Sequence, residues 1–151
     1  MVCIGIIPRI FMIGGRELTH VLDANSYLIL SNPPIMIDIG TGLGIMNLIR
    51  NLLELGIRPS TISYLIITHA HIWNAGGCNK FKELTNCSVI AHYLDSKVLR
   101  QPIPELMDSP THLISPCIAS IEISKPEWNI DVKGMNVAIC LLYTSPSPRD
   151  L

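Results

Sequence analysis

The sequence predicts an α/β fold in which strands and helices alternate within one domain. Three observations support this: the order strand, helix, strand, helix, strand between residues 35 and 100, a helical period of apolar residues after Gly44, and an isoleucine-rich composition. Isoleucine provides 24 of the 151 residues, and hydrophobic residues make up 48% against 15% charged. Isoleucine favours strands, and the low charged fraction argues against disorder. A chain of this length corresponds to one domain.

The first predicted elements are two short strands joined by a turn. Residues 27–30 (Tyr-Leu-Ile-Leu) and residues 35–39 (Ile-Met-Ile-Asp-Ile) are apolar, and residues 31–34 between them contain two prolines. A Ser-Asn-Pro-Pro sequence is typical of a turn. We therefore expect the two strands to form a hairpin, and the glycines of residues 40–42 to end the second strand.

A helix is predicted over residues 44–55. Its apolar residues recur at the helical period and are Ile45, Leu48, Ile49 and Leu52. Gly56 stands where a C-terminal cap is expected, and a proline follows three residues later.

The next segments repeat the alternation of strands and helices. We expect strands at residues 62–68 and 88–91, and helices at residues 75–84 and 94–100. A strand that follows a crossover helix pairs in parallel with the preceding strand. The sequence therefore predicts a parallel sheet with its connecting helices, and no internal domain boundary.

The sequence after Gln101 is less regular. Five prolines interrupt residues 102–126, which predicts a mostly irregular surface segment and not a second core. A turn is expected at residues 133–135 and a strand at residues 136–139. Residues 140–151 resemble sequencing-adapter DNA translated in frame, so we expect a truncated domain over residues 1–139 and a non-native tail over residues 140–151.

Charge and cysteine usage narrow the functional classes. The formal net charge is -1, with 11 Lys+Arg and 12 Asp+Glu, which argues against a nucleic-acid-binding face. No apolar run reaches the ~20 residues that a membrane span needs. The five cysteines form no CxxC pair, so we expect reduced thiols in a cytoplasmic protein. Pro8 and Arg9 interrupt the apolar N-terminus and no basic region precedes it, so we expect no signal peptide.

The sequence His69-Ala70-His71 is the main candidate for chemistry. It follows the predicted strand at residues 62–68, and sites of open α/β folds lie at the carboxyl ends of parallel strands. In an extended segment, residues i and i+2 point to the same side, so both imidazoles can approach one metal ion. Two histidines provide half of a tetrahedral zinc shell, and a surface location of both histidines remains the alternative.

The segments around these histidines resemble the metallo-β-lactamase superfamily in order and spacing. The matching segments are Asn25–Ile29, Ile37–Gly40, Leu55–Ile57, Ile66–His71 and Gly76–Gly77. The resemblance covers residues 25–100 and continues more faintly to residue 139. It implies the N-terminal part of an αββα sandwich, a site for zinc, iron or manganese, and hydrolysis of a small-molecule ester, thioester or related bond by metal-activated water.

Several site residues are implied by this resemblance. In the family signature T-H-x-H-x-D-H-x-G-G, His69 and His71 match two ligands of the first metal. Asp38 matches an acidic residue that supports the metal site from behind, and such carboxylates orient ligand imidazoles. A turn aspartate that bonds nearby backbone N–H groups is the alternative for Asp38.

The chain departs from the signature at two positions. Trp73 and Asn74 replace the Asp and His that hold the second metal. Tryptophan cannot bind a metal, and an asparagine carbonyl is a poor substitute for imidazole on zinc. Trp73 either lines a remodelled pocket or packs over the loop. The family's third ligand of the first metal would follow the strand at residues 136–139, beyond the expected truncation.

The resemblance therefore implies at most one zinc, iron or manganese ion, or none, in this chain. The expected function is a fragment of a metal-dependent hydrolase with impaired activity. One alternative is a non-catalytic relative that has lost its second metal site. Another is an S-adenosylmethionine-dependent methyltransferase, because residues 38–44 (Asp-Ile-Gly-Thr-Gly-Leu-Gly) resemble the glycine-rich motif of that class.

Overall fold

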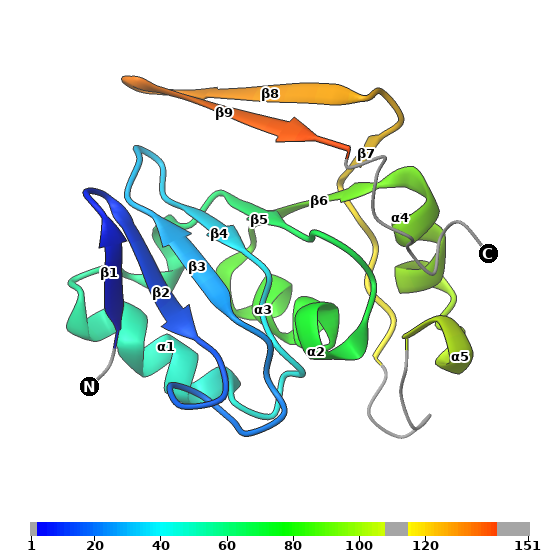
Figure 1. The fold of residues 1–151 in the computed structure, drawn as a ribbon, viewed down its shortest axis with the longest axis horizontal. Coiled ribbons are helices and arrows are strands. Elements are labelled where there is room, and N and C mark those ends of the chain that lie inside the picture. Colours follow the sequence, from blue (N-terminus) through cyan, green and yellow to red (C-terminus); the bar gives the residue numbers. More distant parts are fainter. Residues whose placement is uncertain (1–2, 108–114, 142–151) are drawn as a thin grey trace.

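The computed structural model of the chain describes residues 3–107 and 115–141. Seven strands form one sheet in the order of the sequence (Figure 1). They are β1 (Ile4–Ile7), β2 (Ile10–Gly14), β3 (Ser26–Ile29), β4 (Ile35–Ile37), β5 (Tyr64–Ile66), β6 (Ser88–His92) and β7 (Ile121–Ile123). A separate hairpin consists of β8 (Glu127–Val132) and β9 (Met135–Cys140).

The helices lie between the strands in sequence. They are α1 (Ile45–Glu54), α2 (Ile72–Ala75), α3 (Cys78–Thr85), α4 (Tyr93–Arg100) and α5 (Pro104–Met107), with a single 3₁₀ turn at Pro59–Thr61. Helices α1, α2 and α3 lie on one side of the sheet, and the β8–β9 hairpin lies on the other (Figure 1). The described chain is therefore layered as helices, sheet and hairpin, which confirms the predicted α/β class.

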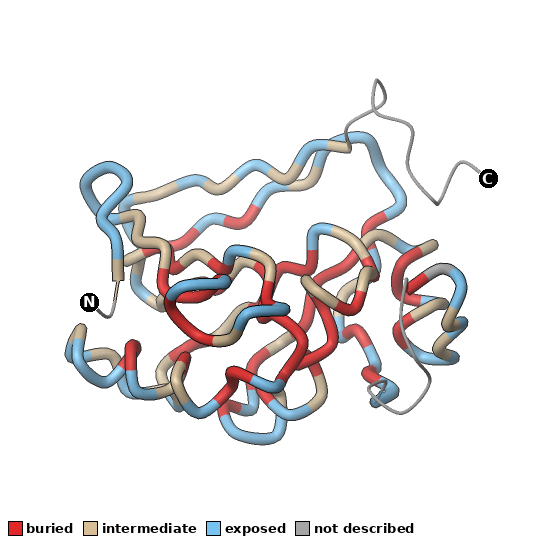
Figure 2. Tube along the Cα trace, turned by 60° about the horizontal axis from the view of Figure 1, so that its bottom comes forward, coloured by how far each residue is buried: buried red, intermediate tan, exposed pale blue. Residues whose placement is uncertain are grey.

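The two faces of the sheet bury different residues because side chains alternate along a strand. Leu28, Met36, Leu65 and Val89 belong to the core on the helix side. Their sequence neighbours Ile29, Ile35, Ile66 and Ile90 belong to the core on the hairpin side. Buried positions accordingly concentrate in the interior of the molecule (Figure 2). The consecutive apolar residues of these strands follow from burial on both faces.

The predicted pairing of the central strands is confirmed. β3 and β4 pair antiparallel, with Leu28 opposite Met36. β4, β5, β6 and β7 then pair in parallel. Parallel strands bring their carboxyl ends to one edge of the sheet, where the segment after β5 carries the candidate histidines.

The predicted helix at residues 44–55 is also confirmed, and Gly56 ends it as expected. Gly56 has a positive φ of 77°, which glycine adopts without strain. The N–H groups of Gly56 and Ile57 donate to the carbonyls of Leu53 and Leu52. This is the Schellman arrangement, which satisfies carbonyls at the end of a helix.

The predicted helix at residues 75–84 needs a correction. Two helices, α2 and α3, occupy this region and are separated by Gly76 and Gly77. A Cβ atom on Gly76 would lie 2.7 Å from the Thr41 carbonyl oxygen, and one on Gly77 would lie 3.0 Å from Gly42 Cα. The two glycines therefore allow α2 and α3 to approach the loop after β4 closely.

The expectation of an irregular surface segment over residues 102–126 is wrong for residues 121–123, and the strand at residues 127–132 was not expected. β7 extends the sheet, and Ile130 and Val132 of β8 are buried against its hairpin side. This segment contributes to a second core, which the proline-rich sequence did not suggest. The predicted turn at residues 133–135 and the strand that follows it are confirmed in the β8–β9 hairpin. Of the expected tail, residues 142–151 lie outside the described residues.

Two further sequence inferences can be compared with the described residues. The five cysteines are free thiols, and Cys78, Cys87 and Cys117 are buried. Within residues 3–107 and 115–141, no helix combines the length and hydrophobicity that crossing a bilayer requires.

Candidate metal centre

The two candidate histidines lie in the extended connection between β5 and α2. His71 directly precedes α2, and its carbonyl oxygen accepts hydrogen bonds from the N–H groups of Asn74 and Ala75. His69 and His71 are both half-buried, whereas Ala70 between them is buried. The connection therefore packs the methyl group of Ala70 into the core and leaves both imidazoles accessible.

The imidazoles of His69 and His71 converge, as their spacing predicts. His69 Nε2 lies 3.1 Å from His71 Nδ1, and the ring centroids are 4.6 Å apart. Two nitrogens bound to one tetrahedral zinc at 2.0–2.1 Å would be about 3.3–3.4 Å apart. The observed separation is that of a hydrogen bond between the two rings, and it is close to the distance between two corners of such a shell. The two rings therefore point toward each other and do not diverge.

Asp38 lies behind the histidines and holds the segment that carries them. The carboxylate accepts hydrogen bonds from the Thr68 N–H at 2.8 Å, the Thr68 hydroxyl at 2.7 Å and the Asn74 amide at 2.8 Å. Asp38 is buried, and this burial raises the pKa of its carboxyl, whereas the hydrogen bonds from Thr68 and Asn74 oppose the rise. A turn aspartate would bond the N–H groups of nearby residues. The backbone N–H that Asp38 binds belongs instead to Thr68, thirty residues away.

Thr68 connects the Asp38 carboxylate to the His69 ring. The Thr68 hydroxyl donates its only proton to Asp38, and its oxygen lies 3.0 Å from His69 Nδ1. With that proton committed, the hydroxyl can only accept at Nδ1, which places the imidazole proton on Nδ1. The neutral ring then keeps its lone pair on Nε2, the nitrogen that faces His71. This network therefore prepares His69 Nε2 to act as a ligand.

Trp73 and Asn74 have structural contacts at the positions where the signature has metal ligands. The Asn74 side-chain amide donates to Asp38, and the main-chain carbonyl oxygen of Asn74 accepts from the Ile39 N–H at 2.8 Å. Trp73 is half-buried and packs against the core on the helix side. The Trp73 carbonyl oxygen accepts from the Ala24 N–H at 2.9 Å. Both residues attach α2 to neighbouring loops.

The histidine pair has no further metal ligand nearby in the part of the chain that the structure describes. Within residues 3–107 and 115–141, no group of three or more His, Cys, Asp or Glu side chains is arranged to hold a metal ion. The described donor set is therefore two imidazoles, which is half of a mononuclear site.

Sequence reasoning missed Asp23, which organises the glycine-rich loop after β4. Its carboxylate accepts from the Thr41 N–H at 2.8 Å and from the hydroxyls of Thr41 and Thr19, each at 2.6 Å. A Cβ atom on Gly40 would lie 2.6 Å from Asp23 Cγ. The glycines thus make room for a buried side chain of the same chain. The methyltransferase alternative rested on the glycine-rich residues 38–44. The packing of this loop around Asp23 explains its glycines without a bound cofactor.

We expect Gly44→Ala to destabilise the protein by about 1–3 kcal/mol. A Cβ atom on Gly44 would contact the Asp23 carboxylate and would lie 2.7 Å from Thr19 Cβ. Gly5→Ala is the control, because its added Cβ would lie 3.8 Å from the Phe11 ring in ordinary contact. Urea unfolding of both variants measures the difference. Equal midpoints would contradict this account of the loop.

The chain is an α/β sandwich protein, because helices pack on a mixed sheet. It has a candidate metal site, because two imidazoles meet beyond the carboxyl end of a parallel strand. The chain belongs to the metallo-beta-lactamase superfamily, whose family model matches residues 20–135. No curated protein matches it significantly. The resemblance inferred from the signature segments is thereby confirmed.

Solved structures show the same fold. The metallo-beta-lactamase GOB-18 from Elizabethkingia meningoseptica is 22% identical with a TM-score of 0.78, over 90% of this chain and 49% of that one. The subclass B3 enzyme BJP-1 of Bradyrhizobium japonicum is 17% identical with a TM-score of 0.77, over 90% and 50%. A Cronobacter sakazakii metallo-beta-lactamase with an HARLDQ motif is 22% identical with a TM-score of 0.73, over 86% and 51%. The chain spans about half the length of these structures.

Proposed function

We propose that the chain carries two ligands of a single metal ion, and that the whole protein is a metal-dependent hydrolase of a small-molecule ester, thioester or related bond. His69 would bind through Nε2 and His71 through Nδ1. The observation that supports this is the 3.1 Å separation of these two nitrogens. Zinc is the first candidate and iron the second, because imidazole suits both metals. Manganese is the further alternative that the family resemblance implies.

The residues around the pair have defined tasks in this proposal. Thr68 keeps the proton on His69 Nδ1, and Asp38 holds Thr68 in place. When bound, the metal supplies Lewis-acid activation of water at neutral pH. Trp73 stands where the signature has a carboxylate, so this chain has no general base at that position. We expect general-base assistance of about 10²–10⁴ in rate to be missing.

A non-catalytic relative is the second candidate function. It is favoured by the hydrogen bond from the Asn74 amide to Asp38 at 2.8 Å, because this contact gives the position a structural use. The two candidates differ in metal binding. A hydrolase requires a bound ion, whereas a relative that has lost its metal chemistry does not.

We expect zinc titration of the chain, monitored by competition with a chromophoric chelator, to show at most one weakly bound ion. His69→Ala and His71→Ala should each abolish that binding, because one imidazole leaves a single ligand. His20→Ala is the control, since the His20 ring bonds the Leu22 N–H in another loop. No binding at saturating zinc would favour the non-catalytic relative. Binding that survives His69→Ala would refute the assigned ligands.

A further inference from the structure

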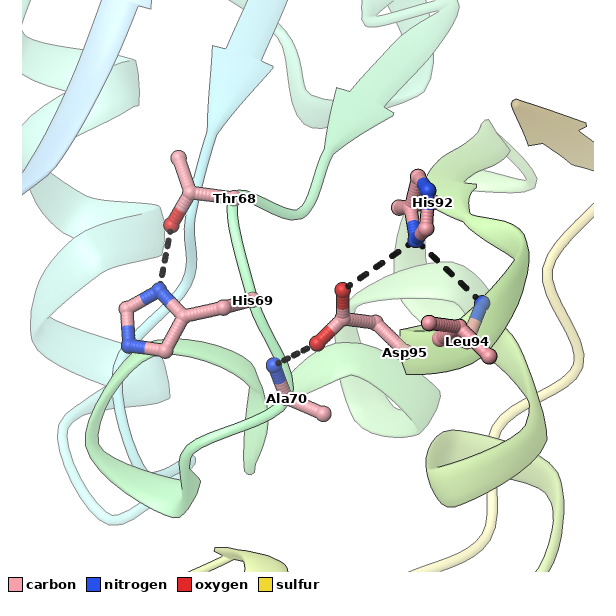
Figure 3. A network of polar contacts seen from close by, with 6 residues as sticks. All are labelled: Thr68, His69, Ala70, His92, Leu94 and Asp95. Atoms are coloured by element: carbon pink, nitrogen blue, oxygen red, sulfur yellow. Dashed lines mark hydrogen bonds and ion pairs between the residues drawn. The ribbon is translucent and has the colours of Figure 1, made fainter. Parts of the chain in front are cut away.

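The peptide between the two candidate ligands is held by a carboxylate from another element. The Ala70 N–H donates to Asp95 Oδ1 at 2.9 Å (Figure 3). Asp95 lies in the first turn of α4 and is 3% exposed, and Ala70 is 4% exposed. The hydrogen bond is therefore buried, and water cannot easily replace Asp95 as its acceptor.

Asp95 is one of two carboxylates that hold this segment from opposite sides of β5. Asp38 follows β4 and accepts from the Thr68 N–H, whereas Asp95 follows β6 and accepts from the Ala70 N–H. In the sheet, β5 lies between β4 and β6. The segment is thus fixed immediately before His69 and again between His69 and His71.

The position of Asp95 is itself determined by the start of α4. His92 caps this helix, since its Nδ1 accepts from the Leu94 N–H at 3.4 Å and lies 4.0 Å from Asp95 Oδ2. In addition, the Ser96 hydroxyl donates to Glu122 of β7 at 2.6 Å. These contacts attach the first turn of α4 to the sheet. They therefore hold the Oδ1 atom of Asp95 in place beside the Ala70 N–H.

We propose that Asp95 is a positioning residue for the His69 and His71 pair, acting through the peptide of Ala70. Only that residue separates the two histidines, so a rotation of its backbone would swing one ring away from the other. The hydrogen bond to Asp95 sets this backbone and hence the 3.1 Å separation of the two ring nitrogens. The relevance of that separation to a metal rests on the proposed function.

The experiment compares Asp95→Ala and Asp95→Asn in the complete chain by zinc titration and by ¹⁵N NMR of the histidine rings without zinc. Asp95→Ala removes the acceptor, and we expect zinc affinity to fall on the order of tenfold or more. Asp95→Asn removes the charge but keeps an oxygen for the Ala70 N–H, so its affinity should stay within about threefold of wild type, well short of the loss that removal of a supporting group causes. Asp131→Asn, on the exposed side of β8, is the matched control and should change nothing.

The ring signals provide a readout that does not depend on zinc. In the wild type and in Asp95→Asn, each ring should show one fixed tautomer, whereas Asp95→Ala should release both to a tautomer mixture. Wild-type ring signals and zinc affinity in Asp95→Ala would overturn the proposal. So would an equal loss in Asp95→Asn, since that result would assign the effect to charge.

A failure of Asp95→Ala to fold and a lack of zinc binding by the wild type each require a second measurement. If Asp95→Ala does not fold, Asp95→Glu replaces it, because the extra methylene group displaces the acceptor. A wild-type affinity and wild-type ring signals in Asp95→Glu would then contradict the proposal. If wild-type protein binds no zinc, the proposed function fails, and the ring signals alone decide whether Asp95 positions the pair.

Discussion

Phe81→Ala is expected to lower the free energy of unfolding by about 3–5 kcal/mol. Phe81 of α3 is 0% exposed and belongs to the core between the helices and the sheet. Its removal would delete buried apolar surface and leave a cavity that the surrounding strands cannot fill completely. The loss would consume a large share of the 5–15 kcal/mol that stabilises an ordinary domain.

Leu84→Ala provides the matched comparison on the same helix. Leu84 is 52% exposed, so its truncation should change stability by no more than about 0.5 kcal/mol. Urea unfolding followed by circular dichroism would measure both variants, with an unchanged dependence on denaturant concentration. A loss below about 1 kcal/mol for Phe81→Ala would mean that α3 is not packed under the sheet as described.

The parts of the fold that were predictable are those with a strong local period. The apolar period of α1 and the short apolar strands β3 to β6 are readable without tertiary information. β1 was missed because all four of its residues are exposed, so no alternation marks it. β8 was also missed, although Ile130 and Val132 alternate with polar neighbours, because the prolines around it dominated the interpretation.

The candidate site also has a part that the local sequence predicts and a part that it does not. The approach of His69 and His71 was predictable, because it depends only on an extended backbone and a spacing of two. Asp95 and Asp23 act over 25 and 18 residues of sequence. Contacts of that kind depend on how the loops and helices pack, which no local period encodes. The local feature of Asp95 is its place in the first turn of α4, where acidic residues are favoured.

Asp38→Ala is expected to cost about 2–4 kcal/mol and to weaken zinc binding by the chain. Two of its three donors belong to Thr68 and the third to Asn74. Hydrogen bonds to a charged group contribute about 1.5–3 kcal/mol each and are not additive within one network. Alanine would also have to adopt the positive φ of 56° found at Asp38, a conformation that aspartate and asparagine tolerate better.

Two further variants separate these contributions. Asp38→Gly accepts the positive φ but removes the acceptor, whereas Asp38→Asn accepts the positive φ and keeps one carbonyl oxygen. We expect the order of stability wild type, Asn, Gly, Ala, measured by urea unfolding at neutral pH. Zinc affinity should fall in the Gly and Ala variants, which lack the acceptor, and should fall less in the Asn variant. Backbone strain should not affect it, because only the acceptor holds Thr68 against His69. Equal stability and equal zinc affinity of the Asn and Gly variants would show that the carboxylate does not organise the histidine segment.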